Sequence, residues 1–414
     1  MDRFDAVWYN AHLATMQPDG TPYGAVRDGV VAARDGVIAY AGARTGFASD
    51  PRDAAAAYDC AGRWITPGLI DPHTHVVFGG DRVADFERRV AGESYVAASG
   101  GSLSGDGSGI AYTVARTRAA SEDELFASAA ARVRTMVANG TTTLEIKSGY
   151  GLDADTEMRM LRVARRIGDE LGVSVRPTFL GAHVVPPEYA HDRDAYVRLV
   201  CDDMIPRIAR EGLADAVDAF CDTIAFTPAE TECVLASARA HGLPVKVHAD
   251  QIADTGAAAL AARCGATSAD HLEHTRQDGV AALARAGTVA VVLPGAYYYL
   301  RETAKPPIDV LREHGVPIAI ATDCNPGTSP VLTLPTAMNM ACVLFGLTPE
   351  EALAGVTRNA ARALGLHDRG ILRAGMRCDL ALWNVASPAE LSYWLGASRC
   401  SGVVIATEPD AGRF

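Results

Sequence analysis

The spacing of apolar residues changes twice along the 414-residue chain, which indicates a central region flanked by two similar ends. Residues 1–66 carry short apolar and β-branched runs broken by turns, such as 29–33 and 36–40, and this pattern is typical of antiparallel strands. Residues 366–414 show the same pattern as residues 1–66, with apolar runs at 379–383 and 402–406. Because chain ends often lie close together, we expect both ends to form one small β-sandwich domain.

Between these ends, short apolar runs alternate with longer stretches of helical periodicity. Eight strand-like runs are predicted, at 64–76, 141–149, 173–183, 215–226, 243–250, 266–274, 288–296 and 316–323. Eight βα repeats predict an α/β fold in which residues 67–365 form a closed (β/α)8 barrel of the TIM type. A doubly wound open sheet is the alternative, but no G-x-G-x-x-G motif opens the first unit.

One segment interrupts the alternation. Ser99–Gly109 contains five glycines and four serines, and it lies between the first strand and the helix expected near Ser121. Two interpretations stay open, a flexible surface loop or a lid over the active face of the barrel.

Polar residues follow several of the predicted strands. The first strand ends in Asp71-Pro72-His73-Thr74-His75, and because residues i and i+2 of a strand share a face, both imidazoles point the same way. The C-terminal ends of barrel strands converge on one axis. Three histidines and a carboxylate from three strands therefore form a candidate four-ligand site for a divalent metal such as zinc: His73, His75, His248 and Asp323. His271, at the end of the sixth strand, lies beside this set as a base or electrophile.

Composition narrows the class of protein. Hydrophobic residues make up 49% of the chain and charged residues 21%, as in soluble globular proteins. A net charge of −12 argues against binding to nucleic acid or to anionic lipid. We find no signal peptide, no long apolar span and, among nine cysteines, no C-x-x-C pair. We therefore expect a cytoplasmic protein that acts on a small molecule and not on nucleic acid or a membrane.

The motifs at these strand ends resemble the amidohydrolase superfamily over essentially the whole chain. The stretches that carry the resemblance are PGLIDPHTHVVFGGDR (67–82), RVAGESY (89–95), EIKSGYGL (145–152), FLGAHVVP (179–186), KVHADQ (246–251), SADHLEH (268–274) and ATDCNPGTSP (321–330). The combination of SGYGL, GAHVVP and DCNPGTSP further resembles the branch that opens the ring of imidazolone propionate in histidine degradation.

The resemblance implies a role for each matching residue. The four candidate ligands would hold one divalent metal ion per chain, zinc or iron, with zinc favoured. His271 matches the sixth-strand histidine beside the metal. The positions expected to contact the substrate are Arg82, Tyr150, His183, Gln251, Asn325, Gly327 and Thr328. The family also implies a homodimer.

The chemistry of the expected reaction agrees with these residue types. A bound metal lowers the pKa of its water to roughly 7 and polarises a carbonyl group. Asp323 would accept the proton of the water and return it to the ring nitrogen, while His271 would hydrogen-bond the oxyanion. Arg82 would bind the propionate arm through two parallel hydrogen bonds. Gln251 is an amide and cannot transfer a proton. We therefore count it among the catalytic residues as the one that orients the ring of the substrate.

The number of metal ions can be predicted from the positions of the lysines. Two-metal relatives commonly bridge their ions with a carboxylated lysine near the fourth strand, and residues 214–226 contain no lysine. Lys147 and Lys246 are not well placed for that role, so one metal is predicted.

Two alternative functions stay open: another mononuclear amidohydrolase, such as a deaminase of an aromatic heterocycle, and a metal-free paralogue that serves as a scaffold. The four intact ligand positions argue against the scaffold.

Overall fold

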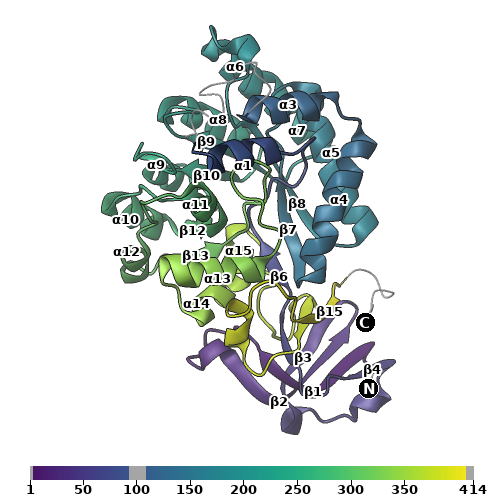
Figure 1. The fold of residues 1–414 in the computed structure, drawn as a ribbon. Helices are drawn as coiled ribbons and strands as arrows, with labels where there is room; N and C mark the ends of the chain where they lie inside the picture. Colours follow the sequence, from purple (N-terminus) through teal and green to yellow (C-terminus); the bar gives the residue numbers. More distant parts are fainter. Residues whose placement is uncertain (1–2, 93–108, 407–414) are drawn as a thin grey trace.

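Two sheets organise the computed structural model, which describes residues 3–92 and 109–406 (Figure 1). One sheet has eight strands from the middle of the chain, and the other has seven strands from its two ends. The Gly/Ser-rich segment Ser99–Gly109 lies outside the described residues except for Gly109. Among the described residues, no helix is long and apolar enough to cross a membrane.

The eight-stranded sheet is parallel, and its strands neighbour one another in sequence order. They are β6 (Leu69–Asp71), β7 (Thr141–Lys147), β8 (Ser174–Ala182), β9 (Ala216–Cys221), β10 (Val245–Ala249), β11 (Ser268–His271), β12 (Val289–Val292) and β13 (Ile318–Ile320). The first and last strands meet just beyond their ends: Asp323 N donates to His73 O (3.0 Å), and His75 N donates to Cys324 O (2.9 Å). The prediction of a (β/α)8 barrel is confirmed, and the barrel closes through the residues expected to bind metal.

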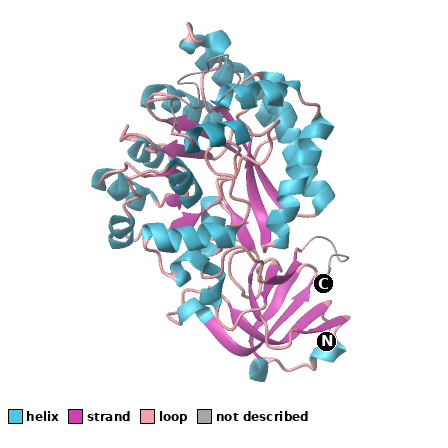
Figure 2. Cartoon of the chain, in the orientation of Figure 1, coloured by secondary structure: helices cyan, strands magenta, loops and turns pink. Residues whose placement is uncertain are grey.

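Helices surround the strands on the outside of the barrel (Figure 2). They are α1 (Val83–Val90), α3 (Gly109–Ala119), α4 (Glu122–Ala138), α5 (Ala154–Leu171), α6 (Arg193–Leu199), α7 (Ile205–Glu211), α8 (Pro228–Ala240), α9 (Ala257–Arg263), α10 (Gln277–Ala286), α11 (Pro294–Leu300), α12 (Ile308–Glu313), α13 (Leu334–Phe345), α14 (Pro349–Gly355) and α15 (Arg358–Ala363). A π-helical turn, Val200–Met204, joins α6 to α7. Short 3-10 turns lie at Pro22–Gly24, Arg44–Gly46, Pro51–Asp53, Pro187–Tyr189 and Pro388–Ser392.

Local sequence signals set the ends of these helices. The helix α4 begins at a capping box in which the side chains of Ser121 and Glu124 each satisfy the other's backbone N–H. The helix α5 ends at Gly172, whose φ of +64° is the left-handed conformation that favours glycine. The start of α4 and the end of α5 are therefore set by residues at those positions in the sequence.

The seven-stranded sheet joins both ends of the chain, as predicted. Its strands are β1 (Ala6–Ala14), β2 (Ala25–Arg34), β3 (Val37–Ala43), β4 (Ala56–Asp59), β5 (Trp64–Pro67), β14 (Leu380–Trp383) and β15 (Cys400–Val404), in the order β15-β14-β5-β1-β2-β3 with β4 beside β1. The two ends of the chain meet where β5 pairs antiparallel with β14, with Trp64 opposite Trp383.

The predicted first strand, 64–76, contains two strands of different sheets. Its first part is β5 in the terminal sheet, and its later part is β6 in the barrel. The chain crosses between them at Gly68, where an added Cβ would lie 2.1 Å from Thr142 Oγ1. Both parts are apolar and buried, so the apolar pattern alone does not show the division.

Candidate active site

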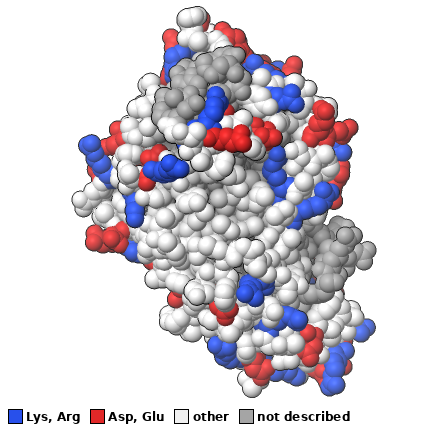
Figure 3. All heavy atoms as spheres, viewed as in Figure 1, with Lys and Arg blue, Asp and Glu red and all other residues white. Residues whose placement is uncertain are grey.

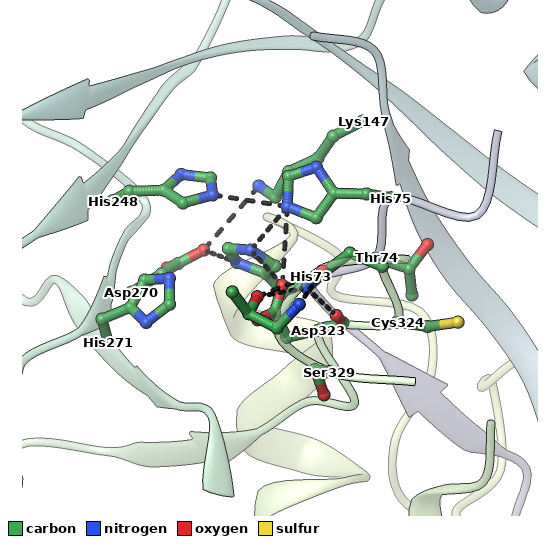
Figure 4. A network of polar contacts seen from close by, with 12 residues as sticks. His73, Thr74, His75, Lys147, His248, Asp270, His271, Asp323, Cys324 and Ser329 are labelled. Carbon is green, nitrogen blue, oxygen red and sulfur yellow. Dashed lines mark hydrogen bonds and ion pairs between the residues drawn. The ribbon is translucent and has the colours of Figure 1, made fainter. Parts of the chain in front are cut away.

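The four predicted metal ligands lie together where β6, β10 and β13 end. His75 Nε2 is 3.2 Å from His73 Nε2 and 3.4 Å from His248 Nε2. Asp323 Oδ1 is 3.5 Å from the Nε2 atoms of both His73 and His75. Figure 4 shows the three imidazoles turned toward one another beside the Asp323 carboxylate. All four side chains are buried.

The donor atoms of His73, His75 and Asp323 lie close enough together to bind one metal ion, and His248 approaches this group through His75. Nitrogen and oxygen ligands of zinc lie roughly 3.3–3.6 Å from one another, since each is about 2.0–2.2 Å from the ion. The observed distances of 3.2–3.5 Å between these ligand atoms match that spacing. Unprotonated imidazole nitrogens this close repel one another unless a cation lies among them. The residues present therefore fit a divalent metal.

Burial keeps the imidazoles neutral. It lowers the pKa of His73, His75 and His271 well below the ordinary value, and neighbouring groups such as Lys147 and His248 add to the shift. Neutral imidazole is the form that binds a metal. His73 Nδ1 lies 2.6 Å from Asp270 Oδ2, so its proton is on Nδ1 and the Nε2 lone pair faces the cluster.

His271 lies beside the ligands at the end of β11. The centre of its ring is 5.4 Å from that of His248 and 5.8 Å from that of His73. The backbone at His271 and Leu272 has φ values of +82° and +75°, which non-glycine residues rarely adopt. Such backbone strain, about 1–3 kcal/mol per residue, is typical of functional sites and here turns the imidazole toward the cluster.

Glu273 is a residue near His271 that the sequence analysis missed. Its Oε2 lies 3.8 Å from His271 Nδ1, and neither atom has a hydrogen-bond partner among the described residues. Burial raises the pKa of Glu273 well above the ordinary value. Its signal was present in the stretch SADHLEH, as an acid two residues after the histidine in an otherwise buried segment.

Arg82 lies at the start of α1 and is buried at the edge of the site. Its Nε donates to Asp85 Oδ2, and that same oxygen accepts from Gly109 N (3.0 Å). A Cβ added at Gly327 would lie 3.0 Å from Arg82 Nη1, so the guanidinium packs against the loop that follows β13. The predicted arginine and the predicted glycine are therefore neighbours.

The loop after β13 is held by the side chain of Asn325. Its Oδ1 accepts from Gly327 N (2.9 Å) and Thr328 N (2.7 Å), and its Nδ2 donates to Asp323 O (2.7 Å). This network ties the backbone beside Arg82 to the backbone carbonyl of Asp323, one of the predicted metal ligands. Hydrogen bonds thus join Asn325, Gly327 and Thr328 into one loop segment between Arg82 and Asp323.

Tyr150 and His183 lie near His75, and they follow the ends of β7 and β8. The ring of His183 stacks on that of His75 with centres 5.5 Å apart, and the ring of Tyr150 lies 5.4 Å from His183. His183 Nδ1 lies 2.9 Å from Gly149 O, so Nδ1 donates and Nε2 is left as an acceptor. Burial, then His248, lowers the pKa of His183 to about 4.

Gln251 and Asp250 lie in the turn after β10. Gln251 is half-buried, three residues past His248. The Asp250 carboxylate accepts from the backbone N–H groups of Thr255, Ala257 and Ala258, at 3.0, 3.0 and 3.2 Å. Asp250 therefore holds the start of α9 in place.

Comparison with known proteins agrees with this geometry. The sequence profile of the Amidohydrolase family matches residues 64–407. The chain belongs to the amidohydrolase family. Two similar relatives are imidazolonepropionases: one from Bradyrhizobium sp. strain BTAi1 is 56% identical over 95% of this chain and 96% of that protein, and one from Methylobacterium sp. strain 4-46 is 58% identical over the same shares. Within the family, this amidohydrolase groups with the imidazolonepropionases.

Solved structures of lower identity share the fold. An adenosine deaminase from Xanthomonas campestris with bound zinc has a TM-score of 0.71 at 18% identity, over 98% of this amidohydrolase and 92% of that chain. An atrazine chlorohydrolase from Arthrobacter aurescens complexed with zinc has a TM-score of 0.69 at 16% identity, over 97% and 94% of the two chains. These likenesses extend over the barrel and the terminal sheet together.

The interior of this amidohydrolase also holds charged residues that the sequence analysis did not place in the site. Lys147, Lys246, Glu145 and Asp218 are fully buried among the barrel strands. Burial lowers the pKa of Lys147, but Asp218, Glu145 and Asp270 raise it by more, to above its ordinary value. The alternating pattern of the strands could have indicated them from the sequence. Glu145 and Lys147 stand two residues apart in an apolar strand, as do Lys246 and His248, so each pair shares one face.

Proposed function

We propose that this amidohydrolase hydrolyses the cyclic amide of imidazolone propionate to N-formimidoyl-L-glutamate, a step of histidine degradation. The observation that carries the proposal is a buried arginine packed on the loop that follows Asp323, in a chain 55–58% identical to imidazolonepropionases over most of its length. The cluster suits hydrolysis of an amide, and the arginine suits a substrate that carries a carboxylate.

We propose one zinc ion per chain as the cofactor, held by His73, His75, His248 and Asp323. Zinc is favoured over iron because histidine nitrogens with one carboxylate oxygen are a donor set that zinc commonly takes in proteins. When bound, such a cation acidifies a water molecule to a pKa of about 7 and polarises the amide carbonyl.

Asp323 and His271 would then do the proton and charge chemistry. Burial raises the pKa of Asp323 well above the ordinary value. The carboxylate of Asp323 would accept a proton from the attacking water and return it to the departing ring nitrogen. His271, neutral and beside the cluster, would donate a hydrogen bond to the oxyanion of the tetrahedral intermediate.

The remaining predicted residues would bind and orient the substrate. Arg82 would receive the propionate carboxylate, with the backbone of Gly327 and Thr328 beside it, held by Asn325. His183 would accept a hydrogen bond from a ring N–H through Nε2, since its Nδ1 is bonded to Gly149 O. Tyr150 would close the same side of the ring, and Gln251 would orient the ring through its amide.

We also propose a homodimer formed through one exposed apolar surface. Val343 on α13 is 73% exposed, and Tyr393 and Leu395, which follow Pro388–Ser392, are 69% and 60% exposed. Asn339 Nδ2 donates to Ser392 O (2.7 Å), so the two segments are adjacent. Figure 3 shows a broad face without charged side chains over the middle of the molecule, where Figure 1 places α13. A single charge introduced as Leu395→Glu should shift the sedimentation coefficient from that of a dimer to that of a monomer.

The domain division and the cellular location remain proposals as well. We propose that residues 67–365 form the catalytic domain and that 1–66 and 366–414 form the second domain. We propose the cytoplasm as the site of action, because all nine cysteines are free.

The activity is tested by following two products in one assay. Purified protein is incubated with imidazolone propionate while the imidazolone absorbance and free ammonia are recorded. We expect the absorbance to fall without release of ammonia, because ring opening retains both nitrogens in the product. Release of ammonia without ring opening would identify a deaminase and reject the proposal.

A further inference from the structure

Two buried lysines lie in the barrel interior next to the metal-binding histidines. Lys147 ends β7 and Lys246 lies on β10, two residues before His248 and on the same face of the strand. Their side chains are 0% and 1% exposed. The chain has one other lysine, Lys305, which is exposed. Most positive charge is thus carried by arginine, and the two interior lysines are exceptional.

Both lysines contact the same carboxylate oxygen. Glu145 Oε2 lies 2.8 Å from Lys147 Nζ and 2.8 Å from Lys246 Nζ. The other oxygen of Glu145 accepts from Thr178 Oγ1 (2.6 Å), and Lys246 Nζ also donates to Pro72 O (2.8 Å). Glu145 therefore fixes the two ammonium groups relative to each other and to the chain just before His73.

Two further carboxylates connect the lysines to the metal ligands. Asp218 Oδ2 lies 2.6 Å from Lys147 Nζ and 3.0 Å from His248 Nδ1, and this second contact is close but lacks the geometry of a hydrogen bond. Asp270 Oδ2 lies 2.6 Å from His73 Nδ1, and the two Nζ atoms lie 3.8 and 3.7 Å from that same oxygen. Figure 4 shows Lys147 and Asp270 behind the histidine cluster.

The charges of this group balance to within one unit. Counted in their ionised forms, three carboxylates and two ammonium groups carry one net negative charge in a region closed to water. Without the lysines, three buried carboxylates would repel one another at high cost. The residual negative charge lies next to the Nδ1 atoms of two ligands, where it favours a cation at their Nε2 atoms.

We propose that Lys147 is a positioning residue shared by two metal ligands. Together with Lys246 and Glu145, it holds Asp218 and Asp270 so that His248 and His73 keep their Nδ1–H tautomers and aim Nε2 at a common point before any metal binds. The inference rests on the proposed metal site, but not on the proposed substrate. A wild-type protein that binds zinc without opening the imidazolone ring would reject the substrate and leave this inference standing.

The first test measures zinc affinity of the metal-free protein against a chromophoric chelator. Loss of the partners that orient metal ligands typically costs 10–100-fold in affinity, so Lys147→Met should raise the zinc Kd about 10–100-fold. Lys305→Met is the matched control, because it removes a lysine whose Nζ bonds only a helix-end carbonyl, Leu344 O. Its zinc Kd should equal that of the wild type.

A second variant separates positioning from support of the fold. Lys147→Met leaves Asp218 as a buried charge with one partner fewer, which destabilises the barrel. The double variant Lys147→Met/Asp218→Asn removes the ion pair as a unit and keeps an oxygen that His248 Nδ1–H can reach. It should recover most of the lost free energy of unfolding, while its zinc Kd stays at least about tenfold above that of the wild type.

A third readout uses the histidines directly. In metal-free protein carrying 15N-labelled histidine, NMR should report the Nδ1–H tautomer for His73 and His248, and a mixture of tautomers in Lys147→Met. The proposal is overturned if the foldable variants bind zinc within twofold of the wild type with unchanged tautomers. In that case the charged group would only support the barrel.

Discussion

The metal side and the arginine side of the site are built in different ways. On the metal side, His73, His248 and Asp323 stand at strand ends: Asp270 bonds His73, Asp218 lies 3.0 Å from His248 Nδ1, and the Asn325 amide bonds the carbonyl of Asp323. On the arginine side, Arg82 starts a helix of eight residues and packs on the Gly327 loop. The difference suggests a division of labour, in which the barrel fixes the reaction chemistry and α1 with the loop after β13 selects the substrate.

The largest effect should come from the metal side. Asp323→Asn keeps the shape of a ligand but removes the group that accepts the proton, so kcat should fall about 10²–10⁴-fold. Steady-state kinetics together with the zinc content of the purified variant measure this change. Asp278→Asn, on the exposed first turn of α10, is the matched control and should leave kcat unchanged. A variant that retains metal and near-normal kcat would remove Asp323 from the proton path.

A smaller effect, and one of a different kind, is expected from the arginine side. Lysine cannot form two parallel hydrogen bonds to a carboxylate, so Arg82→Lys should raise KM about 10–100-fold and lower kcat much less. Zinc content should stay normal. Arg198→Lys, on the exposed surface of α6, is the control. If Arg82→Lys lowers kcat with KM unchanged, or releases the metal, the two sides are not independent.

The amide near the metal side offers a sharper test. Gln251→Glu introduces a carboxylate into the turn after β10, but we assign proton transfer to Asp323. Activity should therefore remain within about tenfold of the wild type. A collapse of kcat as large as that of Asp323→Asn would show that the amide itself is essential and would refute the assignment.

The smallest effect concerns stability as a function of pH. Burial lowers the pKa of His183 to about 4, whereas the ordinary value is 6.5. As pH falls from 6.5 toward 4, the unfolded chain takes up a proton that the folded chain does not, so the free energy of unfolding decreases; above 6.5 this contribution is absent. His73, His75 and His271 shift in the same direction.

Urea unfolding of the metal-free protein at several pH values measures this slope. The variant His183→Gln should lose part of it, corresponding to one proton. A free energy of unfolding that stays level or rises as the pH falls through this window would contradict the account.

The sequence predicted the barrel because its signals are local and repeated. Alternating apolar runs and helix-stopping glycines such as Gly172 report on neighbouring residues, and eight repeats leave few topologies. The motif His73-Thr74-His75 was informative for the same reason, since strand geometry alone places both rings on one face. The split of 64–76 between two sheets was missed because apolar residues on both sides of Gly68 are buried in different partners.

The parts of the site that the sequence did not show depend on contacts between distant strands. Lys147 and Asp218 are 71 residues apart along the chain and meet only when β7 and β9 close around the barrel interior. The raised pKa of Glu273 comes from burial, and its place beside His271 comes from the backbone turn at that residue. Neither feature can be predicted from the sequence alone. Arg82 was found through resemblance, whereas its partner Asp85 became apparent only in the folded chain.

Metal dependence of ring opening tests the central claim most directly. The purified protein is assayed for loss of imidazolone absorbance as isolated, after full removal of metal by a chelator, and after return of one equivalent of zinc per chain. The account predicts that activity disappears with the metal and returns with the zinc. Ring opening that persists after metal removal, confirmed by elemental analysis, would contradict it.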